Sequence, residues 1–166
     1  MKVRLVFVGL IASLTAFVGL TTVALAGPDG SSSAAMCVLN TRLLPENEVR
    51  TTPNTSIASG HAQVKVRNDG TIEFKTFVLN PGDEIFTRAH IHEGNATTNG
   101  PIRVDFLEAG VPVASLSGKT ITFMGDAMVR AGNPNIAALL CASPDQYYVN
   151  FHSTTEPGGA IRGQLG

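Results

Sequence analysis

The residues best suited to chemistry in this chain of 166 residues are three of its four histidines. His90 and His92 are separated by a single residue, and His152 ends the segment 148–152. In an extended strand, residues two positions apart share a face, so His90 and His92 would point the same way. By the same alternation, Asn150 would share a face with His152. Imidazole nitrogens from two paired strands could together bind Zn²⁺ or Cu²⁺.

Two interpretations of these histidines remain open. In the first, His90, His92 and His152 hold a zinc or copper ion. The candidate fourth ligands are His61, Glu93 and Glu156. In the second, the imidazoles form a buried hydrogen-bonded cluster that fixes strand register without any metal. We take the structural cluster as the expectation and the metal site as its alternative.

The other residue patterns argue against an enzyme. The carboxylate pairs Glu46/Glu48 and Asp83/Glu84 fall in turn-rich segments and are expected to be solvated rather than catalytic. The sequence contains neither a nucleophile-elbow serine nor a phosphate-binding glycine loop. Lys and Arg do not cluster anywhere beyond residue 4, and the net charge is -1, so a nucleic-acid binder is not expected.

The N-terminal segment predicts export. Basic residues at positions 2 and 4 precede an uncharged run, 5–26, which ends in the small-x-small sequence Ala-Leu-Ala. This pattern is typical of a signal peptide over residues 1–26, and the mature protein would then be secreted or periplasmic with no membrane span. An uncleaved membrane anchor is the alternative, since the run is nearly long enough to cross a bilayer. Residues 27–36 are rich in small residues and are expected to be a flexible linker.

The two cysteines fit the same compartment. Cys37 and Cys141 are the only ones in the chain, and in an oxidising environment they are expected to form one disulfide. The alternative is a pair of free thiols, one of them a metal ligand.

The elements that must position these residues are short strands separated by turn signals. An Asn-Asp-Gly sequence at 68–70 predicts a hairpin turn. One or two short helices are expected near 126–140, interrupted by Gly-Asn-Pro at 132–134. The pattern predicts an all-β fold, an antiparallel sandwich or flattened barrel. The expected strands cover residues 37–44, 58–67, 71–79, 86–93, 101–108, 111–116, 119–124, 146–153 and 159–165.

Two segments carry a family resemblance. Residues 89–105 (AHIHEGNATTNGPIRVD) and 147–165 (YYVNFHSTTEPGGAIRGQL) resemble the chordin-type, or CHRD, domain, and residues 43–49 are similar to its usual opening. The resemblance implies an immunoglobulin-like or superoxide-dismutase-like β-sandwich over 37–166, in a secreted protein of bacterial single-domain type with no established catalytic activity. Ala160 stands where the family often has Glu, and Glu156 could substitute for that carboxylate.

From these observations we expect a secreted, non-enzymatic binding or structural module. Its partner would be an extracellular or envelope component of unknown identity. Arg162 is expected to tie the last strand to the histidine strands through its planar fork. The alternative is a metal-binding protein with redox or dismutase-like chemistry. The expected binding or structural cluster consists of His90, His92, Asn150, His152 and Arg162.

Overall fold

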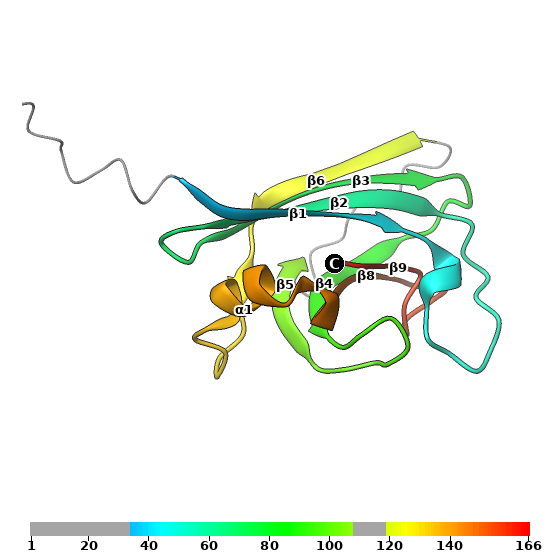
Figure 1. The fold of residues 1–166 in the computed structure, drawn as a ribbon. Coiled ribbons are helices and arrows are strands. Elements are labelled where there is room, and N and C mark those ends of the chain that lie inside the picture. The colour runs from blue at the N-terminus through cyan, green and yellow to red at the C-terminus, as the bar shows by residue number, and fades with distance from the viewer. Residues whose placement is uncertain (1–33, 108–118) are drawn as a thin grey trace, which may run out of the picture.

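Two antiparallel sheets lie face to face in the computed structural model, which describes residues 34–107 and 119–166 (Figure 1). The first sheet has the order β1-β2-β3-β6, with β1 at Ala35–Leu43, β2 at Ser59–Arg67, β3 at Ile72–Asn80 and β6 at Lys119–Asp126. The second sheet has the order β7-β5-β4-β8-β9, with β7 at Met128–Val129, β5 at Ile102–Leu107, β4 at Phe86–Glu93, β8 at Tyr147–Ser153 and β9 at Ile161–Gln164. The predicted all-β antiparallel sandwich is confirmed.

Some sequence predictions fall on residues that the structure does not describe. The expected signal peptide at 1–26, most of the linker at 27–36 and the expected strand at 111–116 lie outside the described ranges. The last two residues of the expected linker, 35 and 36, belong to β1.

The hydrophobic core fills the space between the sheets, and strand alternation places it there. In β2 the buried positions are the alternate ones, including Val64 and Val66, which are fully buried. The second sheet contributes Ile91 from β4 and Phe151 from β8. The predicted hairpin turn joins β2 to β3, and Gly70 adopts the positive φ of +87° that such a turn requires. Each strand therefore turns one face inward and leaves the other for solvent or for loops.

One helix is present among the described residues, and it begins later than the sequence predicts. Helix α1 covers Ile136–Ala142, while part of the region expected to be helical, residues 128–129, forms β7. Pro134 lies just before the helix, where its ring cannot interrupt the helical hydrogen bonds. A 3₁₀ turn at Pro144–Gln146 then leads into β8. No helix in the described ranges has the length and apolar character needed to cross a membrane.

A disulfide joins the first sheet to this helix. Cys37 of β1 and Cys141 of α1 are bonded, with their Cα atoms 5.8 Å apart. The predicted pairing is confirmed. The bond closes a loop with a sequence separation of 104 residues, so it links the first described strand to the segment that leads into β8.

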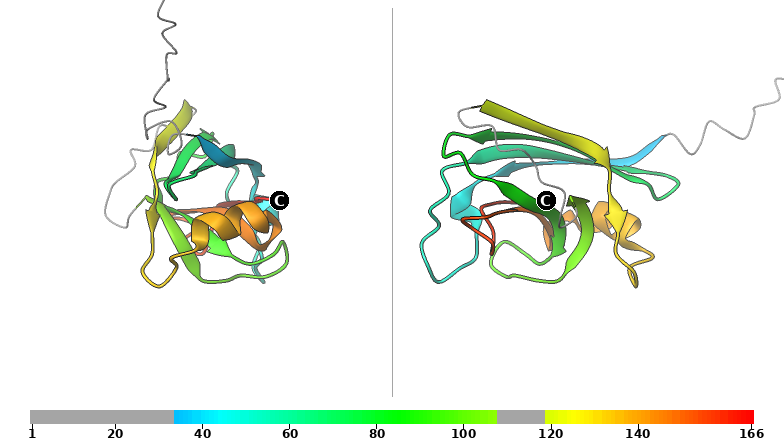
Figure 2. Two further views of the ribbon diagram at one scale, coloured as in Figure 1. Left: turned by 60° about the vertical axis from the view of Figure 1, so that its left-hand side comes forward. Right: turned by 180° about the vertical axis from the view of Figure 1, so that it is seen from behind.

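Loops cover the side of the second sheet that faces away from the first. The segment between β4 and β5, at 94–101, runs beneath that sheet, and the segment after β1 descends at its edge (Figure 2). Asn99 of the former donates a 2.8 Å hydrogen bond to the carbonyl oxygen of Val49 in the latter. As a result β8 is buried at almost every residue, on both faces. This covered face carries the polar residues singled out above.

Candidate functional site

Three histidine rings meet on the covered face of the second sheet. His90 and His92 lie on β4, and His152 lies on the neighbouring strand β8. The ring centroids are separated by 5.5 Å for His90 and His92, 5.0 Å for His90 and His152, and 5.9 Å for His92 and His152. One nitrogen from each ring lies within 4.8 Å of the other two. The strand pairing that the sequence implied brings all three together.

Backbone carbonyls orient two of the rings. His92 Nδ1 donates a hydrogen bond to the carbonyl oxygen of Gly100 at 2.9 Å, and His152 Nδ1 donates to that of Pro157 at 3.0 Å. A carbonyl oxygen can only accept, so each Nδ1 must carry the hydrogen. In a neutral imidazole the other nitrogen then holds a lone pair. Nε2 of His92 and Nε2 of His152 are therefore acceptors.

A carboxylate orients the third ring in the opposite sense. His90 Nε2 lies 3.4 Å from Asp105 Oδ1, which belongs to the adjacent strand β5. Asp105 is itself held by Arg130 through two hydrogen bonds of 2.7 and 2.8 Å. With its Nε2 facing a carboxylate, His90 keeps its lone pair on Nδ1. His90 Nδ1, His92 Nε2 and His152 Nε2 are all buried and have no hydrogen-bond partner among the described residues.

Burial keeps these imidazoles neutral. It lowers the pKa of His90 to about 3, and the neighbouring His152 and His92 act in the same direction. Burial also lowers the pKa of His92 to about 4, against the opposing effect of its bond to Gly100. The pKa of His152 is lowered as well, again chiefly by burial. Desolvation disfavours the charged imidazolium, so at neutral pH the cluster presents lone pairs rather than charges.

Arg162 of β9 supports the cluster from one side. It is 1% exposed, and its guanidinium donates to Asn99 Oδ1 at 3.0 Å and to the carbonyl oxygens of Asn95 and Thr98 at 2.7 and 2.9 Å. Its Cζ also lies 3.4 Å from the ring centroid of Tyr148, a cation–π contact. Arg162 therefore fastens the last strand to the loop between the histidine strand β4 and β5.

Tyr148 lies between Arg162 and the histidines and contacts both. Its ring stacks on His92 with centroids 4.9 Å apart and an interplanar angle of 10°. Its hydroxyl accepts a 3.2 Å hydrogen bond from the backbone N–H of Gly100, the residue whose carbonyl orients His92. A Cβ at Gly100 would overlap the carbonyl oxygen of Glu93, so only glycine allows this loop to approach β4 so closely.

The prediction of solvated carboxylates is wrong for Glu84, and Glu48 is half-buried rather than solvated. Glu84 is buried, and its carboxylate accepts hydrogen bonds from the hydroxyls of Ser56 and Ser153. Glu48 lies against Asn150, whose Nδ2 is 3.3 Å from Glu48 Oε2. Burial raises the pKa of Glu48 to about 7, although Arg162 and Asn150 act to lower it. The turn-rich sequence gave no indication that these loops fold back onto the sheet.

The candidate fourth ligands do not join the cluster. His61 is exposed on β2 of the other sheet, and Glu93 is paired with Arg103. Glu156 binds Arg50 at 2.7 Å and accepts from the backbone N–H of Thr55, also at 2.7 Å. Within the described ranges, the group suited to a metal consists of the three histidines alone. Glu156 therefore holds the loop that contains Arg50 and Thr55 and is not a ligand candidate.

Sequence reasoning missed the residues that orient the rings. Asp105 was recognisable only once its strand was known to pair with β4, because the register places it opposite His90. The carbonyl groups of Gly100 and Pro157 have no side-chain signature at all. Glu48 lies in the segment 43–49, which resembles the opening of the family pattern, so the sequence offered a reason to consider it. Nothing in the sequence indicated that it would be buried.

One of three comparisons with known proteins found a match. The family model of the CHRD domain matches residues 39–165, which is most of the described chain. The search of curated proteins and the search of solved structures each returned no match.

Proposed function

The chain belongs to the CHRD domain family, and from this membership we propose that it is a secreted, non-enzymatic module that acts by binding. Its partner would be a component of the cell envelope or of the extracellular medium. The observation that carries the proposal is the family match over residues 39–165. A fold by itself does not supply a function, so the proposal also draws on what the polar residues do.

The structural use of the buried polar groups supports a role without catalysis. The carboxylate of Glu84 is engaged by two serine hydroxyls, and that of Glu156 by Arg50 and Thr55. The guanidinium of Arg162 is occupied by oxygens of one loop. Groups held in this way stabilise the folded chain, because buried polar groups need such partners.

The covalent chemistry supports an exported protein. Disulfides persist in oxidising compartments and are rare in the cytosol of most organisms. The bond between Cys37 and Cys141 fits the leader-like sequence at residues 1–26. Together they favour a mature chain that begins at Gly27 and folds outside the cytoplasm.

Two measurements test this proposal. The first follows the full-length chain, tagged at its C-terminus, in its native cells. We expect the protein outside the cytoplasm, with Gly27 as its first residue by mass spectrometry. An intact chain that stays in the cytoplasm with free thiols would overturn the assignment to an exported protein.

The second measurement addresses binding. The oxidised protein is immobilised and exposed to envelope and medium fractions of the same cells, beside a reduced and alkylated sample as the control. Any retained component is purified, and its affinity is measured in solution. Saturable one-to-one binding to the oxidised form alone supports the proposal. Turnover of a retained component into a new product would instead show that the protein is an enzyme.

A further inference from the structure

We propose that His90, His92 and His152 form a site for one divalent transition cation of the Zn²⁺ or Cu²⁺ type. The ligand atoms would be Nδ1 of His90 and Nε2 of His92 and of His152. This inference goes beyond the proposed function and does not depend on it, because a binding module could carry such a site for structure or for recognition.

The first argument is hydrogen-bond accounting. Each ring has one nitrogen next to an oxygen of Gly100, Pro157 or Asp105, and within the described ranges the remaining three nitrogens are buried without a partner. All three are lone-pair acceptors, so they cannot satisfy one another. A single water has two O–H donors and would leave one nitrogen unpaired. One cation can accept all three lone pairs at once.

The second argument is the type of outer partner. Histidines that bind metals usually donate their other N–H to a backbone carbonyl or a carboxylate, which fixes the ring and raises its basicity. Two carbonyls have this role here, and the Asp105 carboxylate lies 3.4 Å from Nε2 of the third ring; the sheet and its loops hold all three groups. A cluster built only to fill space would not need an ordered outer partner for each ring.

The third argument concerns the choice of ion. Three imidazoles suit zinc and copper, whereas magnesium and calcium prefer oxygen ligands. Zinc–nitrogen bonds of about 2.0–2.1 Å place two ligand nitrogens at most about 4 Å apart. One nitrogen from each ring lies within 4.8 Å of the other two, so a movement of about 1 Å would close the site around an ion. Three protein ligands would leave a fourth position for water or for a group on a partner.

The test is a metal titration of chelator-treated protein. ZnCl₂ and CuCl₂ are titrated calorimetrically into the wild type, with MgCl₂ as the comparison cation. The variant is His152→Ala, because His152 is the least buried of the three rings. The matched control is His61→Ala, which removes an exposed histidine from the other sheet.

We expect the wild type and His61→Ala to bind one equivalent of Zn²⁺ or Cu²⁺ with the same affinity, and Mg²⁺ not at all. His152→Ala should bind at least about 100-fold more weakly, beyond the 10–100-fold that loss of an outer partner costs. Electron paramagnetic resonance of the Cu²⁺ form should show nitrogen coupling from three imidazoles. The variant should show coupling from two.

Several results would overturn the proposal. They are the absence of saturable binding in the wild type, equal affinities in the wild type and His152→Ala, or a loss of binding in His61→Ala. If His152→Ala does not fold, His152→Phe keeps the ring volume without the nitrogen and is used in its place. Asp105→Asn offers an independent arm, since it leaves all three ligands in place. It should weaken binding by about 10–100-fold, and unchanged affinity there would contradict the assigned role of Asp105.

Discussion

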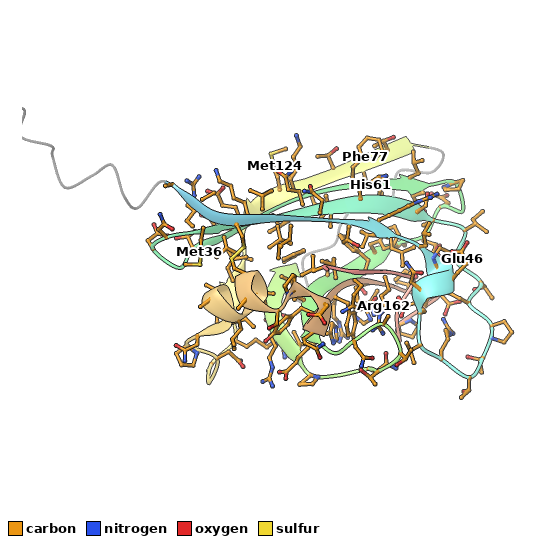
Figure 3. The ribbon with its side chains drawn as sticks, viewed as in Figure 1. Met36, Glu46, His61, Phe77, Met124 and Arg162 are labelled. Atoms are coloured by element: carbon orange, nitrogen blue, oxygen red, sulfur yellow. A yellow bond between two sulfur atoms is a disulfide. The ribbon has the colours of Figure 1, made fainter. Side chains whose placement is uncertain are left out.

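The outward faces of the two sheets have the opposite exposure from the one that the polarity of their side chains would suggest. On the first sheet, Phe77 and Met124 point away from the core and are 45% and 65% exposed (Figure 3). On the second sheet, the corresponding face carries His90 and Arg162, which are 2% and 1% exposed. Apolar side chains thus lie in solvent on one side of the molecule, and ionisable ones are buried on the other.

The difference shows that loops determine burial here, rather than the polarity of the side chains. The loop at 94–101 covers the second sheet because its own carbonyl groups bind Arg162 and His92. A buried polar group needs partners, and on this face most of those partners are backbone carbonyl groups of the loop at 94–101. The covered face therefore fixes one loop conformation, whereas the open face imposes no comparable constraint. The following substitutions test this contrast.

The largest effect is expected from the disulfide, which fastens the open sheet to the helix leading into β8. Replacing both Cys37 and Cys141 with Ala should lower the free energy of unfolding by about 4–5 kcal/mol, because the closed loop is long. Urea denaturation of the oxidised wild type and of the double variant measures this difference in the free energy of unfolding. Equal midpoints would mean that the two sheets hold together without the bond.

Arg162→Ala should be the most damaging single change on the covered face. It leaves three oxygens without a donor, and hydrogen bonds to a charged group contribute about 1.5–3 kcal/mol each, so we expect a loss of about 3 kcal/mol or more. Arg42→Ala, on the exposed side of β1, is the matched control and should change stability by less than about 0.5 kcal/mol. Similar effects for the two variants would remove the contrast between the faces.

In the metal-free protein, His92→Ala should cost about 1–3 kcal/mol, because the Gly100 carbonyl loses its donor and Tyr148 loses its stacking partner. His61→Ala on the other sheet should be close to neutral. Thermal melts in the presence of a chelator compare them. A neutral His92→Ala would indicate that this ring contributes little to holding the loop.

The covered face should also respond to pH through Glu48. Its pKa is about 7 in the folded protein against 4.5 for an ordinary glutamate, so the folded state retains a proton that the unfolded state has released. This carboxyl's stabilisation is present below pH 4.5 and is lost as the pH rises to about 7. Glu48→Gln stays neutral, so its free energy of unfolding should rise relative to that of the wild type across that window, by no more than about 1.4 kcal/mol per pH unit.

Measuring both proteins at the same pH values cancels the contribution of the histidines, which has the opposite sign. A difference between Glu48→Gln and the wild type that does not vary from pH 4.5 to 7 would contradict the raised pKa of Glu48.

The smallest effect is expected on the open face. Phe77→Thr replaces a half-exposed ring in β3 with another residue that suits a strand, and it should change stability by no more than about 0.5 kcal/mol. Chemical denaturation is again the measurement. A loss as large as that of His92→Ala would mean that this face is packed against something in solution.

The same contrast explains what the sequence could predict. Alternation in β2 and β4 correctly indicated the sandwich and the shared face of His90 and His92, because strand periodicity is a local property. It could not predict that loops would bury that face. The burial of Glu48 depends on contact with Asn150, 102 positions away, and the orientation of His152 depends on a carbonyl group. Helix α1 begins later than predicted because residues 128–129 pair with β5 instead of forming a helix. Such pairing with a distant strand cannot be predicted from helix propensity, which depends on local sequence.

The hydrogen bonds of Arg162 have a consequence for how the chain acquires its fold. They join β9 to residues 63–67 positions earlier, and Gln164 bonds Gly94 across 70 positions. Contacts of such long range form slowly, because the intervening chain must lose its freedom before they can stabilise anything. A nascent chain that has not yet released β9 would leave β8 without its neighbour and the histidine face uncovered. Until then the unpaired edge of β8 is open to association with other chains, so the pairing of β9 also protects this edge of the sheet.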